Sequence, residues 1–120
     1  MNNKRIFLPI FNSNFSVFSC DEIVFIKAKG AYSKIYNNIS KDVQIALSLK
    51  QFNDSFSDCG FFRCHRSYII NLNYVTKFNI RKGVVGLNNN IEIPLAVSCR
   101  EQFVIQLNKI SKIEYESKIM

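Results

Sequence analysis

The sequence predicts a mainly β fold with two short helices. Aromatic and β-branched residues gather in short runs that are separated by Asn, Ser and Gly turn sequences. Apolar residues follow helical spacing in only two places. The length of 120 residues and the 48% hydrophobic content suit one domain over residues 1–120, large enough to bury a core without metal or disulfide bonds.

Strand signals fill the first part of the chain. The turn sequence Asn12-Ser13-Asn14 and Gly30 each separate two aromatic or β-branched runs, so two hairpins are expected. A fifth run alternates between apolar and polar residues from Val43 to Leu49, as a half-buried strand does. These five strands are predicted at residues 5–11, 15–18, 23–28, 32–36 and 43–49.

A short helix is predicted at residues 48–57. Leu49, Phe52 and Phe56 lie at helical spacing, and Ser48 with Gln51 forms a capping-box sequence. The sequence Asp58-Cys59-Gly60 ends this helix.

Strand signals return in the next part of the chain. The polar break His65-Arg66-Ser67, the turn Arg81-Lys82-Gly83 and the run Asn88-Asn89-Asn90 separate apolar segments, and Asn71 is expected to cap a turn. The predicted strands cover residues 61–64, 68–72, 75–80, 84–87 and 91–94.

The second helix is predicted at residues 98–110. Phe103, Leu107 and Ile110 repeat at helical spacing, and Ser98 with Glu101 forms another capping-box sequence. Arg100 is therefore expected in the first helical turn, with residues 111–120 as a C-terminal tail.

The net charge of +7 is distributed unevenly. Residues 23–41 carry four lysines and residues 59–91 carry five Lys and Arg residues, and neither segment contains an acid. Acid-free basic segments are typical of nucleic-acid binding, although a basic solvated surface has the same composition.

The four cysteines are expected to be reduced, partly buried thiols. Their spacings are irregular, and the chain has a core without them. Cys59, Cys64 and His65 would supply only three of the four ligands of a zinc site, so no metal is expected.

No enzyme is predicted. His65 is the only histidine, and the chain has no P-loop, no G-x-G-x-x-G and no H-E-x-x-H motif. We therefore expect no cofactor and no small-molecule substrate. The absence of a long apolar run and of a signal-peptide core predicts a cytoplasmic protein with no membrane partner.

One stretch resembles a family signature: Phe61-Phe62-Arg63-Cys64-His65-Arg66-Ser67-Tyr68-Ile69-Ile70-Asn71. It is similar to the F-x-R-x-H-R-S-Y-x-V-N phrase of LytTR domains, the DNA-binding output domains of AgrA-, AlgR- and LytR-type bacterial regulators in two-component signalling. Three further pieces match in order and extend the resemblance over about residues 4–110: Asp21 to Ile35, Ser48 to Phe52, and Ile93 to Arg100. The chain departs from the pattern at Lys27, where glutamate is usual, and at two extra residues, Ala96 and Val97.

The resemblance implies a small, elongated arrangement of antiparallel sheets that binds double-stranded DNA sequence-specifically. It places loops between strands, instead of a recognition helix, in successive major grooves. It also implies paired direct repeats in a promoter, with a second copy of the chain on the same DNA. Three contact regions carry over by position: Lys29, Tyr32, Ser33 and Lys34; His65, Arg66 and Ser67; Ser98 and Arg100.

Physical chemistry supports some of these contacts independently. Arg66 lies at a polar turn, so its guanidinium is expected to project outward and can bind guanine, or else form a surface ion pair. Arg100 in a first helical turn opposes the helix dipole unless a phosphate binds there, and it could also be an ordinary exposed arginine. Lys29, Lys34 and Lys82 suit phosphate contacts or solubilising charge, and His65 suits a structural role.

Two other hypotheses remain open from the sequence. The chain could be a protein-interaction module of the same fold that modulates another regulator without binding promoter DNA. Cys64 and Cys99 flank two contact regions, so a redox role for this pair is a further hypothesis. We expect no receiver domain in this chain, and its start at Met1 favours a stand-alone regulator over an excised output domain.

Overall fold

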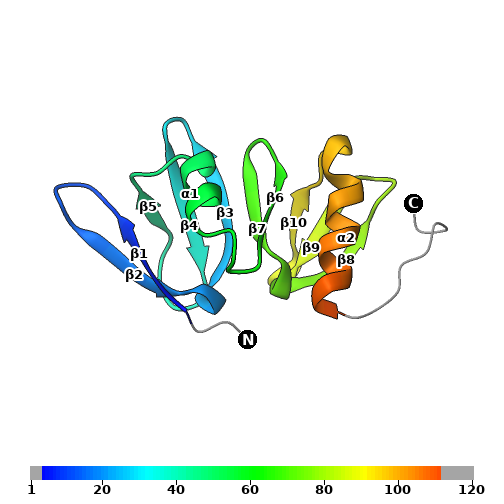
Figure 1. Cartoon of the computed structure of the whole chain (residues 1–120), viewed down its shortest axis with the longest axis horizontal. Helices are drawn as coiled ribbons and strands as arrows, with labels where there is room; N and C mark the ends of the chain where they lie inside the picture. Colours follow the sequence, from blue (N-terminus) through cyan, green and yellow to red (C-terminus); the bar gives the residue numbers. More distant parts are fainter. Residues whose placement is uncertain (1–3, 112–120) are drawn as a thin grey trace.

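The computed structural model of the chain describes residues 4–111. It is elongated, with extents of 50 × 29 × 26 Å, and consists of three antiparallel sheets with two α-helices (Figure 1). The predicted mainly β fold class is therefore confirmed.

The three sheets follow one another along the long axis (Figure 1). A two-stranded sheet comes first, and a five-stranded sheet of order β5-β4-β3-β7-β6 and a three-stranded sheet of order β10-β9-β8 follow. The strands are β1 (Arg5–Pro9), β2 (Phe15–Ser19), β3 (Ile23–Lys29), β4 (Tyr32–Asn37), β5 (Val43–Ile45), β6 (Phe61–His65), β7 (Tyr68–Asn71), β8 (Val75–Asn79), β9 (Val84–Leu87) and β10 (Ile91–Pro94).

The α-helices are α1 (Leu49–Ser55) and α2 (Arg100–Ser111). Four single-turn 3₁₀ helices connect the other elements: η1 (Cys20–Glu22), η2 (Leu72–Tyr74), η3 (Asn88–Asn90) and η4 (Val97–Cys99).

Two hydrophobic cores lie on opposite faces of the central sheet, because successive side chains of a strand alternate between faces. Ile26 of β3 joins the first core, where α1 contributes Phe52 and the β1–β2 hairpin contributes Leu8. Phe25, its neighbour in the strand, joins the second core together with Phe103 of α2 and residues of the three-stranded sheet. The central sheet thus supports both halves of the molecule.

The first helix begins as predicted, whereas the strand before it is shorter. The Gln51 N–H donates to Ser48 Oγ at 3.1 Å, and the Ser48 N–H donates to Gln51 Oε1 at 2.9 Å, which confirms the capping box. The strand predicted to run to Leu49 ends at Ile45, because the Ala46 N–H donates to the Pro9 carbonyl instead of to β4.

The second helix begins two residues later than predicted. Ser98 lies inside η4, so the expected cap position is wrong. The Cys99 N–H donates to the Ala96 carbonyl at 2.9 Å, and this bond gives the segment a 3₁₀ turn before α2 begins at Arg100. Apart from Ser111, the predicted tail lies outside the described residues.

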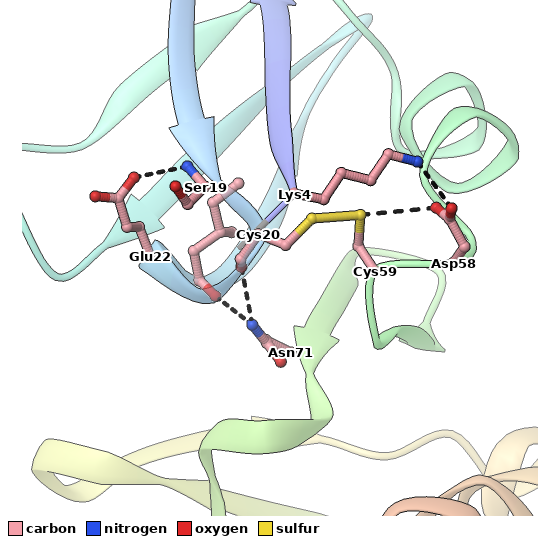
Figure 2. The surroundings of a disulfide bond; sticks show 8 residues. Lys4, Ser19, Cys20, Glu22, Asp58, Cys59 and Asn71 are labelled. Atoms are coloured by element: carbon pink, nitrogen blue, oxygen red, sulfur yellow. Dashed lines mark hydrogen bonds and ion pairs between the residues drawn. A yellow bond between two sulfur atoms is a disulfide. The ribbon is translucent and has the colours of Figure 1, made fainter. Parts of the chain in front are cut away.

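Asn71 joins the two halves of the chain and caps η2, as predicted. Its buried Nδ2 donates to the carbonyls of Cys20 and Ile23 at 3.2 and 2.9 Å (Figure 2). Its Oδ1 accepts from the Asn73 N–H at 3.0 Å in the turn that leads to β8. One buried amide therefore makes hydrogen bonds to backbone groups on both sides of the joint.

Cys20 and Cys59 form a disulfide bond, which corrects the prediction of four reduced thiols (Figure 2). Their Cα atoms lie 5.8 Å apart, although 39 residues separate them in the chain. The sequence spacing could not predict this pair, because packing of η1 against the turn before β6 brings the two residues together. Cys64 and Cys99 are free thiols, as predicted.

We expect Asn71→Ala to lower the free energy of unfolding by about 3 kcal/mol, because the carbonyls of Cys20 and Ile23 each lose a buried hydrogen bond. Urea unfolding followed by circular dichroism measures the change. Asn73→Ala is the matched control: Asn73 is exposed, so its loss should change stability by less than about 0.5 kcal/mol. Equal effects of the two substitutions would contradict the role of Asn71.

Candidate nucleic-acid interface

The three predicted contact regions lie along one edge of the elongated molecule. The β3–β4 turn, the β6–β7 turn and the start of α2 all point to the upper edge in Figure 1. These segments are far apart in the sequence, and only the sheet order brings them into one row.

Backbone hydrogen bonds join neighbouring segments of this edge. The Ala28 N–H, at the end of β3, donates to the Ser67 carbonyl in the β6–β7 turn at 2.9 Å. The Ala96 N–H, before α2, donates to the Cys64 carbonyl at 2.9 Å. The contact segments are therefore held in fixed relative positions, as a rigid binding surface requires.

The β6–β7 turn presents Arg66 to solvent, as expected. The Arg63 Nη2 donates to the Arg66 carbonyl at 3.0 Å, and the Ser67 N–H donates to His65 Nδ1 at 3.1 Å. Both bonds stabilise the turn from within. His65 is half-buried beside Tyr68, with 5.9 Å between ring centroids, which agrees with a structural role.

The β3–β4 turn depends on Gly30, whose φ of +64° lies in the left-handed region. Lys29 and Tyr32 flank the turn and are exposed. Ser33 is fully buried, so the prediction that its side chain contacts DNA is wrong. Its Oγ faces the first core because it shares a sheet face with Ile35, two residues along the strand.

Lys34 and Lys27 lie on the other face of the same hairpin, directly opposite each other in β4 and β3. Lys34 Nζ lies 3.7 Å from Asp42 Oδ2, so part of its charge is neutralised. Lys27 Nζ lies 5.8 Å from the ring centroid of Tyr68. Lys27 was not among the predicted DNA contacts, although the alternation along the strand places it on the same face as Lys29.

Ser98 is exposed at the third segment, whereas Arg100 is half-buried. The guanidinium of Arg100 lies against the β8–β9 turn, where a Cβ atom at Gly83 would be 2.9 Å from Nη2. Arg100 Nε is buried without a hydrogen-bond partner within the described residues. The packing brings Arg100 close to the turn that also carries Lys82.

The chain matches the family model described as the LytTr DNA-binding domain over residues 13–108. It belongs to the LytTR DNA-binding domain family. The match makes the chain a DNA-binding regulatory domain of a non-enzymatic fold.

A solved structure has the same fold. The LytTr DNA-binding domain of a Bacillus cereus protein described as a methyl-accepting/DNA response regulator is 19% identical, with a TM-score of 0.71. The similarity covers 86% of this chain and 95% of that one. A comparison with curated proteins gives no match.

Two negative findings apply to residues 4–111 of this LytTR domain. No helix there is long and apolar enough to span a bilayer. The same residues contain no cluster of three or more His, Cys, Asp and Glu side chains that could hold a metal ion.

The two free thiols of the LytTR domain bind different carbonyls. Cys64 Sγ donates to Pro94 O at 3.5 Å, and Cys99 Sγ donates to Arg63 O at 3.6 Å. Burial raises the pKa of the Cys64 thiol to about 12, so Cys64 is almost entirely protonated at neutral pH. A redox role for this pair stays a prediction, and Cys64 is poorly suited to it because thiolates are the reactive form.

We expect Gly83→Ala to destabilise the domain by about 2–4 kcal/mol. The new Cβ would meet the Leu95 carbonyl and Arg100 Nη2 at 2.9 Å, in addition to the cost of a φ of +70°. Gly30→Ala is the matched control, since its φ is +64° with no atom within 4 Å, and should cost about 1–2 kcal/mol. Urea unfolding compares the two, and equal losses would contradict the close packing of Arg100 on the turn.

Proposed function

We propose that this LytTR domain binds double-stranded DNA sequence-specifically by inserting its β3–β4 and β6–β7 turns into the major groove. The observation that carries the proposal is the exposed Arg66 on a turn braced by Arg63 and His65. An arginine held in this way can donate two parallel hydrogen bonds to guanine O6 and N7. Because hydrogen bonds already fix the β6–β7 turn, less conformational entropy is lost when DNA binds.

The dimensions of the molecule support binding along the duplex. Its long axis measures 50 Å, and one turn of B-DNA repeats about every 34 Å. A molecule of this length can lie across two successive major grooves. The direction of the contact row along the long axis suits this arrangement (Figure 1).

The remaining residues of the edge have different roles in the proposal. Lys29 is exposed and suits a phosphate, and Lys34 suits a weaker phosphate contact because Asp42 lies beside it. Tyr32, Ser67 and Ser98 make secondary contacts with the DNA. Arg100 is half-buried at the start of α2, where its guanidinium suits a phosphate contact.

The expected target is a promoter, read as paired direct repeats by two copies of the chain. DNA binding by a regulatory domain changes transcription of the adjacent gene, so we assign the domain to transcriptional regulation.

A protein-interaction module is the alternative. The outer face of the β1–β2 hairpin favours it, because Phe7 and Phe15 are 63% and 61% exposed. The dependence on salt separates the two functions. DNA affinity falls steeply with salt, with a log–log slope near −0.9 per neutralised phosphate, whereas an apolar protein contact depends on salt only weakly.

We expect Arg66→Ala to weaken binding to the target duplex by roughly 5- to 150-fold, the equivalent of about 1–3 kcal/mol, with a much smaller effect on scrambled duplex. Fluorescence anisotropy at several salt concentrations measures both. The target is found by selection from a random duplex library and compared with the upstream DNA of the gene. Arg5→Ala is the matched control, since it removes one exposed arginine from the hairpin and not from the contact edge.

Each outcome has a defined meaning. Equal losses on both duplexes would make Arg66 a phosphate contact and contradict base reading. Failure to bind any duplex at low salt would overturn the DNA-binding proposal in favour of the interaction module.

A further inference from the structure

The β1–β2 hairpin forms a sheet of its own and is not paired with the central sheet. Ile6, Leu8 and Phe18 pack into the first core, and one backbone bond joins Pro9 to Ala46. The family model begins at Ser13, so β1 lies outside the matched region. The hairpin is therefore held by side-chain packing, by this backbone hydrogen bond and by the links at its base, and not by strand pairing with the central sheet.

Two polar or covalent links fasten the base of the hairpin to the turn before β6 (Figure 2). Cys20 directly follows β2 and is bonded to Cys59. Lys4 Nζ, directly before β1, lies 2.8 Å from Asp58 Oδ2. This ion pair is exposed and therefore weak, so the disulfide is the stronger of the two links.

The other end of the hairpin touches the candidate DNA-contact edge. Phe11 at the tip packs edge-to-face on Tyr32, with 5.0 Å between ring centroids. Both rings are 42% exposed, so this contact lies at the surface of the protein. A change at the base of the hairpin can reach the β3–β4 turn through this contact.

We propose that the N-terminal hairpin positions the β3–β4 DNA-contact turn through Phe11, and that the Cys20–Cys59 pair makes this positioning depend on thiol redox state. Phe11 and the two cysteines are positioning residues, because they act through Tyr32. The proposal rests on the DNA-binding function proposed above. The disulfide form holds the turn ready for binding, and the dithiol form leaves it less ordered.

The redox step is a thiol–disulfide exchange with a small-molecule disulfide. One cysteine thiolate attacks the reagent disulfide, forms a mixed disulfide and releases one reagent thiol. The second thiolate attacks the protein sulfur of this mixed disulfide and releases the second reagent thiol. Two protein thiols are oxidised, two protons leave them, and one reagent disulfide is reduced to two thiols.

Burial makes the exchange depend on motion of the hairpin. Cys20 and Cys59 are 0% and 1% exposed, so a reagent reaches them only when the hairpin opens locally. The free pair Cys64 and Cys99 is a poorer candidate, since each thiol is directed to a different backbone carbonyl.

The test uses the full chain, oxidised with glutathione disulfide or reduced with dithiothreitol. Hydrogen exchange followed by mass spectrometry measures residues 5–19, and anisotropy measures the Kd for the selected duplex. Reduction should speed exchange in the hairpin and weaken DNA binding about three- to tenfold, which is the effect expected for loss of preorganisation of one or two side chains. The double variant Cys20→Ala/Cys59→Ala should match the reduced protein under both conditions.

Cys64→Ala is the matched control, because it removes a buried thiol and leaves the Cys20–Cys59 disulfide intact. It should keep the redox response. Reversible reduction of the wild-type chain gives the same comparison if the double variant does not fold. Equal Kd values in both redox states would overturn the proposal, even if hairpin exchange changed.

The test also separates failure of the proposed redox control from failure of the DNA-binding function. If neither redox state binds any duplex, the DNA-binding proposal and the control of DNA contact are both overturned. If DNA binding is strong and identical in both states, only the proposed redox control by Cys20 and Cys59 is overturned.

Phe11 gives an independent test of positioning. Phe11→Ala in the oxidised protein should bind DNA as weakly as reduced wild type, whereas Phe11→Tyr, which keeps the ring contact, should bind like oxidised wild type. The thermal midpoint measures stability in parallel. Unchanged DNA affinity in Phe11→Ala, or an affinity loss in both variants alike, would contradict transmission through this ring.

Discussion

The architecture depends on the buried amide of Asn71. It lies where the chain leaves the central sheet for the three-stranded sheet, and it binds groups of η1, β3 and η2 at once. Without this side chain, the carbonyls of Cys20 and Ile23 would each lose a buried hydrogen bond, which is costly. One side chain thus links the central sheet, which has a core on each face, to the segment that leads into the three-stranded sheet.

In our proposal, this mainly β domain contacts DNA through turns between strands and not through a recognition helix. Turns between strands are short, and here each is tied to its neighbour through a backbone hydrogen bond. Arg63 and His65 direct their hydrogen-bonding groups inward to the β6–β7 turn and leave Arg66 outside it. Within this short sequence, the side chains of Arg63 and His65 therefore stabilise the turn, and that of Arg66 is exposed.

Local sequence signals predicted the elements well where the physical cause is local. The Ser48–Gln51 capping box and the hairpin turn at Gly30 need only neighbouring residues, and both occur as expected. The early end of β5 was missed because the Ala46 N–H donates to the distant carbonyl of Pro9. The late start of α2 was missed because Ala96, whose carbonyl accepts from Cys99 in the 3₁₀ turn, is itself bonded to the distant carbonyl of Cys64. No periodicity within a segment can reveal such a partner.

The sequence by itself determined the fold class, the family signature around His65-Arg66-Ser67 and the two acid-free basic segments. Hydrophobic spacing, turn chemistry and charge are local properties, so they can be read directly. Only the tertiary structure decided that Ser33 is buried, that Arg100 packs on Gly83 and that Cys20 meets Cys59. These three depend on which face of a strand meets the core and on which distant segments pack together, and burial of apolar surface in the folded chain settles both.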